Sequence, residues 1–452
     1  MPKIILSFSF HFLHLNFSPT TMVSLSSFSL LLHLLLYVAA ANTEYLKLPL
    51  LHKRHHHHHN HRHHQHHRTT VKYPVISAAS SGSGEYLVSL ELGSPPQPLL
   101  LVADTGSDLI WVKCSACHNC SLHPSGSAFL ARHSTSFSPH HCFQSTCRQL
   151  VPHPHPNHCN HTTLHSPCRY QYSYADGSLT SGFFSKETVT FNTTSGHQLQ
   201  LQGFHFGCGF RGITGDSFNG AHGVMGLGRG PISFSSQLGR RFGNKFSYCL
   251  MDYTLSPPPT SFLLIGGRQK DVVPGNQKMS STPLLINPLS PTFYYIGITN
   301  VYVDDVKLRI DPSVWSIDEL GNGGTVVDSG TTLALLVEPA YSEILAAFKK
   351  RVRLPSPVES TVGFDLCVNT SGVLKRSYPR LSFELVGKSV FSPPQRNYFI
   401  ETGEHVECLA IQPVELGSGF SVIGNLMQQG YLFEFDRDRS RLGFSRHGCA
   451  LQ

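Results

Sequence analysis

LLLVADTGSDLIWVKC, residues 99–114, places an ionisable aspartate, Asp104, directly behind an apolar run. A carboxylate at the end of a buried strand is partly desolvated, which raises its free energy unless hydrogen bonds or a second charge compensate. Asp-Thr-Gly-Ser is also ordinary turn chemistry, so this stretch alone is compatible with a strand that simply ends in a turn. A second copy elsewhere in the chain would favour a functional interpretation.

The chain contains such a copy. GNGGTVVDSGTTLALL, residues 321–336, places Asp328 behind an apolar run and ahead of a small hydroxyl residue, a glycine and another small hydroxyl residue. Each copy is followed much later by two apolar residues and a glycine, at 224–226 and at 422–424. A strand that ends in glycine can pass tightly over the loop that carries the aspartate. The repeat therefore predicts two similar β lobes related by an approximate twofold axis.

Short runs of alternating apolar and polar residues continue from Gly84 onward, separated by Gly, Pro and Ser. They predict strands, and together with the repeat they predict an all-β, bilobal fold with a central cleft. Residues 338–354 are the exception, because four apolar residues recur there at helical spacing: Tyr341, Ile344, Leu345 and Phe348. This segment is predicted to be one amphipathic helix over the core.

Two facing lobes would bring Asp104 and Asp328 together. Two carboxylates at close range cannot both ionise at low cost, so they share a proton and titrate as a coupled pair. One can then deprotonate a water molecule while the other protonates a peptide carbonyl oxygen, with no covalent intermediate. We expect six loop residues to support the pair. Thr105 and Ser329 would reach across between the loops, and Ser107 and Thr331 would hydrogen-bond the carboxylates. Gly106 and Gly330 would allow the close approach of the backbone.

The chain from about Gly84 to its end resembles a pepsin-type aspartic endopeptidase, because both aspartate loops and both apolar-apolar-Gly signals occur in that family's order. The resemblance implies a bilobal fold with pseudo-twofold symmetry, protein or peptide substrates, and no cofactor or metal. The family also has a hairpin flap with a tyrosine ahead of a glycine-rich turn. YSYADGSLTSG, residues 172–182, is similar, which implies Tyr174 as the flap tyrosine and Trp111 as its indole partner.

Twelve cysteines, an even number, fit an oxidising compartment. Seven lie in an insert, residues 114–168, that is similar to the insert of the nepenthesin-like plant subgroup: Cys114, Cys117, Cys120, Cys142, Cys147, Cys159 and Cys168. Five follow later: Cys208, Cys249, Cys367, Cys408 and Cys449. Zinc is the alternative for CSACHNC, but an export signal favours disulfides. Because seven and five are both odd, full oxidation requires at least one bridge from the insert to the later chain. Inside the second lobe we expect Cys367 to pair with Cys408.

The N-terminal region predicts export. A leucine-rich stretch runs into Ala39-Ala40-Ala41, which is typical of a signal peptide, and the run is too short for a membrane anchor. Eleven histidines between His52 and His67 cannot form a packed core and are predicted to belong to a disordered, removable pro-segment. The predicted organisation is a signal peptide at 1–41, a His-rich pro-segment at 42–80, an N-terminal lobe at 81–288 and a C-terminal lobe at 289–452.

The formal net charge of +7 does not indicate a nucleic-acid partner. Residues 1–73 hold seven Lys and Arg beside one acid, Glu44, which leaves 28 basic and 27 acidic residues in the remainder. We expect a monomer, secreted to the cell wall or apoplast, with the vacuole as an alternative. Glycosylation is expected at four sequons: Asn119, Asn160, Asn192 and Asn369.

Two other classes of protein compete with a secreted endopeptidase. Some plant proteins that resemble this family have lost catalytic residues and inhibit glycoside hydrolases. Both aspartate loops and the flap tyrosine are intact here, which favours an active enzyme. A metal-binding or storage protein that uses the His tract would leave the duplicated aspartate loops unexplained.

Overall fold

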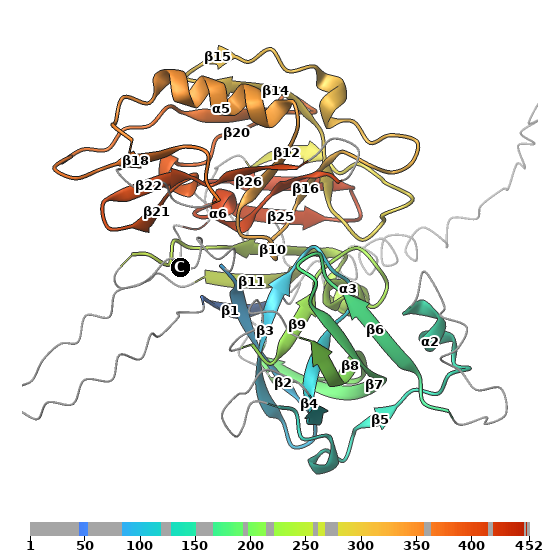
Figure 1. Ribbon diagram of the computed structural model, residues 1–452. Helices are drawn as coiled ribbons and strands as arrows, with labels where there is room; N and C mark the ends of the chain where they lie inside the picture. The colour runs from blue at the N-terminus through green and yellow to red at the C-terminus, as the bar shows by residue number, and fades with distance from the viewer. Residues whose placement is uncertain are drawn as a thin grey trace, which may run out of the picture. The chain divides into compact units, whose positions relative to one another are not determined.

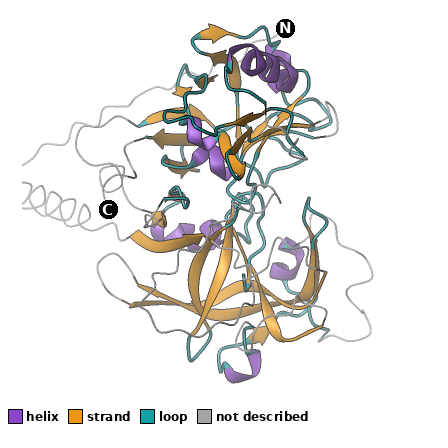
Figure 2. Ribbon diagram, turned by 60° about the vertical axis from the view of Figure 1, so that its left-hand side comes forward, coloured by secondary structure: helices purple, strands orange, loops and turns teal. Residues whose placement is uncertain are grey.

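The computed structural model describes residues 45–52, 84–118, 128–150, 166–192, 198–213, 221–255, 261–266, 279–356, 363–414, 419–446 and 449. All of them belong to one compact unit, Glu44–Gln452. The predicted signal peptide, the histidines beyond His52 and the sequons at Asn119 and Asn160 lie outside the described residues. Strands dominate this unit and helices are few (Figure 1, Figure 2).

The largest sheet contains strands from both halves of the chain. In spatial order they are β12 (Ser280–Pro283), β26 (Arg441–Ser445), β25 (Leu432–Asp436), β10 (Lys245–Cys249), β11 (Ser261–Gly266), β1 (Tyr45–His52), β2 (Tyr86–Leu92), β3 (Gln97–Asp104), β9 (Gly223–Gly226), β4 (Trp111–His118), β8 (Gln198–Ile213), β7 (Leu179–Asn192) and β5 (Ser138–Pro139), with β6 (Arg169–Ser173) paired to β7. The lobe boundary after residue 288 stays a prediction, since β25 and β26 lie beyond it and β25 pairs with β10.

Three smaller sheets are formed by the second half of the chain. The first is β13 (Tyr295–Ile296), β16 (Thr325–Val327), β24 (Ser421–Ile423), β17 (Ala334–Val337) and β23 (Ile411–Val414). The second is β15 (Val306–Lys307), β14 (Ile298–Val303), β19 (Leu381–Leu385) and β20 (Val390–Phe391). The third is β18 (Cys367–Asn369), β22 (Val406–Leu409) and β21 (Phe399–Gly403).

The helices are short, apart from the one that the sequence predicts. They are α2 (Ser145–Gln149), α3 (Phe234–Phe242), α5 (Ala340–Arg351), α6 (Asn425–Gln428) and the 3-10 turns η3 (Ala131–His133), η5 (Pro312–Trp315) and η6 (Gln395–Asn397). The helix predicted over 338–354 is confirmed as α5, which buries Tyr341, Ile344 and Phe348 and packs against β14, β17 and β23.

The prediction that residues 42–80 are disordered is wrong for Tyr45–His52. This segment forms β1, which pairs antiparallel with β11 along six register positions and with β2 along three. The sequence of β1 alternates apolar and polar residues at its start, and the edges of β11 and β2 offer unpaired backbone groups. A short apolar run ahead of the histidines is thus ordered by pairing with neighbouring strands.

Four disulfides join described cysteines: Cys114–Cys208, Cys147–Cys168, Cys249–Cys449 and Cys367–Cys408. Cys142 is disulfide-bonded as well, whereas the side chains of Cys117, Cys120 and Cys159 lie outside the description. The Cys114–Cys208 bridge connects the insert to the later chain, as the parity argument requires. Because the Cys114 sulfur is committed to this bridge, a zinc site that uses it is excluded. Cys367 pairs with Cys408 across β18 and β22, as expected.

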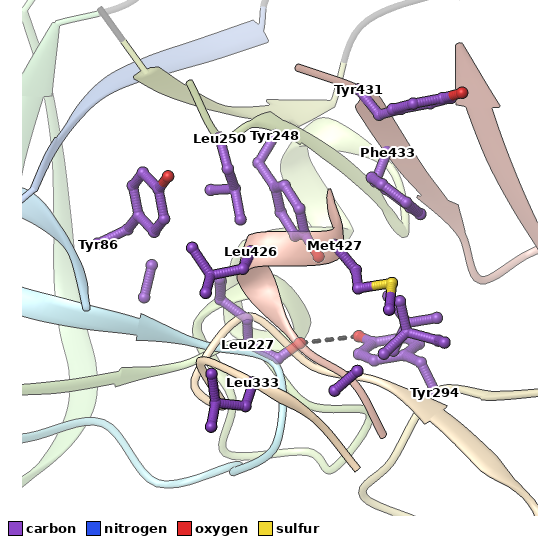
Figure 3. Close-up of a cluster of buried hydrophobic side chains, with 14 of the residues drawn as sticks. Tyr86, Leu227, Tyr248, Leu250, Tyr294, Leu333, Leu426, Met427, Tyr431 and Phe433 are labelled. Carbon is purple, nitrogen blue, oxygen red and sulfur yellow. Dashed lines mark hydrogen bonds between the residues drawn. The ribbon is translucent and has the colours of Figure 1, made fainter. Parts of the chain in front are cut away.

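The main hydrophobic cluster contains side chains from both halves of the chain. Leu227 directly follows the first apolar-apolar-Gly signal, and Leu426 follows the second by two residues. Both are buried in this cluster together with Leu333 (Figure 3). The two halves therefore share one core rather than folding around separate ones. Full burial of such a side chain stabilises the fold by roughly 1.5–3 kcal/mol.

Gly424 offers a test of the close packing around the second signal. A Cβ added there would lie 2.7 Å from the Thr332 carbonyl oxygen and closer still to that of Leu333. We expect Gly424→Ala to lower the free energy of unfolding by about 1–3 kcal/mol, because both neighbours are backbone atoms that cannot move aside. Thermal unfolding measures this difference.

Gly403→Ala is the matched control, because a Cβ at Gly403 would meet only Val406, at 3.9 Å. Equal melting temperatures for the two variants would contradict the close approach of the chain at Gly424.

Candidate active site

The two repeated aspartates follow equivalent strands. Asp104 ends β3, which pairs in parallel with β9 and sets Asp104 opposite Gly226. Asp328 follows β16, which pairs in parallel with β24, and its N–H donates to the Ile423 carbonyl at 3.2 Å. In both halves the apolar-apolar-Gly strand therefore lies beside the strand that carries the aspartate, as the repeat predicted.

Crossed hydrogen bonds join the two aspartate loops. The Ser329 N–H donates to Thr105 Oγ1 at 2.9 Å, and the Thr105 N–H donates to Ser329 Oγ at 3.1 Å. The Ser329 hydroxyl also donates to the Ala103 carbonyl at 2.8 Å. Thr105 and Ser329 are both buried. A buried polar group that loses its hydrogen-bond partner raises the free energy of the folded state, so the crossed bonds hold the two loops in one relative position.

Each carboxylate accepts hydrogen bonds from its own loop. Asp104 accepts the Gly106 N–H at 2.8 Å and the hydroxyl of Ser107. Asp328 accepts the Gly330 N–H at 2.9 Å and the Thr331 hydroxyl at 2.7 Å. The two arrangements are equivalent residue for residue, which is the local expression of the sequence repeat. All six support residues named from the sequence thus lie at the pair.

The loops approach so closely that only glycine fits between them. A Cβ added at Gly106 would lie 2.8 Å from Asp328 Oδ2, and a Cβ at Gly330 would collide with the Asp104 carboxylate. Glycine is required here for space, since neither residue has a positive φ.

The environment of the pair shifts its protonation. Asp104 is 8% exposed and Asp328 is 9% exposed. Burial raises the pKa of Asp104 above its ordinary value of 3.8, and the neighbouring Asp328 charge raises it further. The loops approach closely enough for each carboxyl group to influence the protonation of the other. A pair of this kind retains a proton at a pH where an isolated aspartic acid would have lost it.

The predicted flap is a hairpin made by β6 and β7. Tyr174 lies in its turn, where the Tyr174 N–H donates to the Ser178 carbonyl and Gly177 has φ +81°. The Trp111 indole N–H donates to Tyr174 Oη at 2.6 Å. Burial, followed by the Asp104 charge, raises the pKa of Tyr174 well above its ordinary value. The phenol and the indole that the family resemblance paired are therefore in contact, close to Asp104.

Sequence reasoning missed Asn425 and Gln428, which lie one and four residues beyond the second apolar-apolar-Gly signal. The Asn425 amide donates to the Ser329 carbonyl at 3.1 Å and to the Gly84 carbonyl at 2.8 Å. The Gln428 amide donates to the Asp328 carbonyl at 2.9 Å. Both side chains are fully buried. Their occurrence just after a strand that passes the aspartate loop was the available sequence signal.

Gly84 was also missed as a neighbour of the site. Its N–H donates to Thr332 Oγ1 at 2.7 Å, four residues beyond Asp328. The chain that leads into β2 is thus attached to the second aspartate loop. Two of the predicted glycosylation sites fall within the described residues, in strands that do not carry the aspartates. Asn192 is the last residue of β7, and Asn369, in β18, accepts the Ser371 N–H at 2.8 Å. Glycosylation at both stays a prediction.

Comparisons with known proteins agree with this geometry. A family model described as xylanase inhibitor N-terminal matches residues 86–267, and one described as xylanase inhibitor C-terminal matches residues 293–446. Aspartyl protease family protein 2 of Arabidopsis thaliana is 36% identical over 384 residues, which cover 83% of this chain and 73% of that protein. Aspartic proteinase nepenthesin-1 of Nepenthes gracilis is 36% identical over 377 residues, which cover 83% of this chain and 80% of that protein.

The crystal structure of edgp is similar in fold. Its TM-score is 0.67 at 21% sequence identity, covering 89% of this chain and 94% of that chain. The predicted all-β, bilobal fold is confirmed by this likeness and by the sheets described above, to which a few helices are added. Because two aspartic proteases are 36% identical to this protein over most of both chains, it belongs to the aspartic protease family that includes the nepenthesins, and it is an aspartic-type endopeptidase.

Proposed function

We propose that this protein is a secreted endopeptidase that hydrolyses peptide bonds in proteins at acidic pH, with Asp104 and Asp328 as its catalytic pair. The observation that carries the proposal is the crossing of two buried, equivalent aspartate loops, which brings the two carboxylates close to one another. Other buried acids do not repeat this arrangement among the described residues: Glu407 is paired with Arg376, and Asp252 with Arg396.

The proposed mechanism uses the proton that the pair shares. The raised pKa of Asp104 favours this residue as the carrier of the proton. Asp328 accepts a proton from water as the water oxygen bonds to the peptide carbonyl carbon, and Asp104 donates its proton to the carbonyl oxygen. When the tetrahedral intermediate collapses, the C–N bond breaks, Asp328 gives its proton to the amine nitrogen, and one hydroxyl of the intermediate returns a proton to Asp104, so the pair again holds one proton. No covalent enzyme intermediate forms.

Tyr174 and Trp111 form the flap contact that is proposed to cover the substrate. The Trp111 side chain is buried and lies at the start of β4, so its hydrogen bond ties the hairpin turn to the sheet. A flap held over the pair excludes bulk water and strengthens the electrostatic interactions of the carboxylates.

Secretion is supported by the disulfides and by the signal-like N-terminal sequence. Disulfides persist in oxidising compartments and are rare in the cytosol. In the described part of the chain, no helix is long and apolar enough to span a bilayer. The cell wall or apoplast is the proposed destination, and synthesis as a zymogen with a His-rich pro-segment belongs to the same proposal.

A non-catalytic binder is the alternative suggested by the description of the family models as xylanase inhibitor domains. A binder has no need for two buried carboxylates, which raise the free energy of the folded state when ionised. This chain retains both, with their complete set of hydrogen-bond donors. Peptide hydrolysis explains that retention directly.

Replacing either carboxylate tests the catalytic pair. We expect Asp104→Asn and Asp328→Asn each to lower kcat on a protein substrate at acidic pH by about 10³-fold or more, because an amide neither accepts nor donates the shared proton. The measurement is a peptide-release assay with the zymogen activated. Asp311→Asn is the control, since Asp311 is exposed and its carboxylate accepts a hydrogen bond from the Ser313 N–H at 2.9 Å. Wild-type activity in either dyad variant would rule out the proposed mechanism.

The pair also predicts how stability depends on pH. The folded-state pKa of Asp104 is raised above the unfolded value. Its contribution is therefore complete below the ordinary aspartate pKa and is lost as the pH rises through the raised value. Asp104→Asn replaces the titrating group by a neutral amide. Relative to wild type, we expect its melting temperature to increase between about pH 4 and pH 8, by about 2 °C per kcal/mol gained. Parallel melting curves at all pH values would show that Asp104 titrates normally.

The flap contact is tested by a double-mutant cycle. Trp111→Phe and Tyr174→Phe each remove the hydrogen bond, and we expect each to lower kcat/KM by about 5- to 30-fold, equivalent to roughly 1–2 kcal/mol. The double variant should be no worse than the poorer single variant, since both changes delete one interaction. Tyr302→Phe serves as control, because this hydroxyl bonds Glu384 on β19 at 3.0 Å. Strictly additive losses would mean that the two side chains act independently.

A further inference from the structure

Asp108 lies four residues beyond Asp104, in the same loop, and the proposed chemistry does not use it. Both of its carboxylate oxygens accept hydrogen bonds from distant parts of the chain. Oδ1 accepts the Gly230 N–H at 2.7 Å, and Oδ2 accepts the Thr292 hydroxyl at 2.7 Å. These partners are 122 and 184 residues away in sequence. One side chain thus connects three separate segments.

The glycine-rich turn that follows β9 is shaped around this carboxylate. A Cβ added at Gly228 or Gly230 would collide with the Asp108 carboxylate. The Gly228 N–H donates to the Ser107 carbonyl at 2.8 Å. The turn therefore follows the loop from Ser107 to Asp108, and the glycines leave the space that the carboxylate fills.

Thr292 lies where the chain enters the second half of the protein. Its carbonyl accepts the Arg229 N–H at 3.0 Å, so Thr292 is held by both its backbone and its side chain. Two residues later, Tyr294 donates its hydroxyl to the Leu227 carbonyl at 2.8 Å (Figure 3). The entry segment is thus attached to the turn at several points.

A short path leads from this entry segment to the second aspartate. The Tyr294 carbonyl accepts the Val327 N–H at 3.1 Å, and β13 pairs with β16, the strand that precedes Asp328. A displacement of Thr292 would therefore reach β16 through a few hydrogen bonds. On the other side, the Asp108 N–H donates to Tyr172 Oη at 3.4 Å, two residues ahead of the flap tyrosine.

We propose that Asp108 is a positioning residue for the catalytic pair: its carboxylate joins the Asp104 loop to the Gly228–Gly230 turn and to Thr292, and so aligns the first aspartate with the segment that carries the second. The crossed bonds of Thr105 and Ser329 fix the loops at their tips. Asp108 fixes the same loop at its base. A displacement of about 1 Å in a catalytic group lowers rates by about 10²-fold, so a second attachment has a measurable effect.

The test compares four variants of the full chain after activation. Asp108→Ala removes both acceptors, whereas Asp108→Asn retains one oxygen for the Gly230 N–H and places an amide donor opposite the Thr292 hydroxyl. Thr292→Val removes one bond without touching the loop, and Thr292→Ser restores it. Asp311→Ala is the control, because it also removes a carboxylate that accepts a backbone N–H, but at an exposed position.

The readouts are kcat and KM per active site, with sites counted by titration with a tight-binding statine-type inhibitor. We expect Asp108→Ala to lower kcat by about 30- to 100-fold with KM changed less than about threefold, and Thr292→Val to lower kcat by about 3- to 10-fold. Asp108→Asn and Thr292→Ser should recover most of the loss. A merely structural role would reduce the number of titrated sites and leave kcat per site unchanged, which would overturn the proposal.

Two further outcomes would also overturn it: wild-type kcat in Thr292→Val, or an Asp108→Asn variant as impaired as Asp108→Ala. If Asp108→Ala does not fold, the Thr292 pair alone decides between the outcomes. Because the inference rests on the proposed function, Asp104→Asn is assayed in parallel. An active Asp104→Asn would refute the catalytic pair itself, whereas an inactive Asp104→Asn beside a fully active Asp108→Ala would refute only the role of Asp108.

Discussion

Two buried carboxylates held close together are unfavourable by themselves, and the hydrogen bonds that hold them there constrain the rest of the structure. Burial and mutual charge raise the pKa of Asp104, so the free energy of keeping the pair together must come from the surrounding contacts. The crossed bonds of Thr105 and Ser329 supply the most direct of them. They require the two loops to meet tip to tip, which in turn requires glycine beside each aspartate and a parallel strand behind it.

The central sheet and the shared core make that meeting rigid. β10 pairs with β25, so strands from the two halves lie side by side (Figure 1). The large hydrophobic cluster also includes side chains from both halves. A change in either half is therefore felt at the loop crossing, because a packed core does not deform continuously. Asn425 adds a buried amide that ties the second loop to Gly84, the residue that leads into β2.

Membership of a family whose models are described as xylanase inhibitor domains does not by itself decide between a binder and an enzyme. What distinguishes them is the site. This chain keeps the carboxylates, their donors and the contact between Trp111 and Tyr174. The relatives that cover most of both chains at 36% identity are named as proteases, in agreement with the chemistry that the pair can perform.

The sequence by itself determined the repeat, and with it the fold class, the two aspartates and their six loop neighbours. These features are local patterns, whose spacing within each copy reflects the geometry of one turn. The pairing of Trp111 with the flap came from the resemblance to a known family, since the two residues that bond are 63 positions apart. The sequence did not reveal Asp108, Asn425 or Gly84 as parts of the site, since the partners of the two side chains and of the Gly84 backbone are 96 to 341 residues away. Nor did it place β1 in the sheet, because a short apolar run becomes a strand only when β11 and β2 offer it edges. Tertiary structure decided these points, since long-range hydrogen bonds depend on where the chain returns and leave no periodic signal in the sequence.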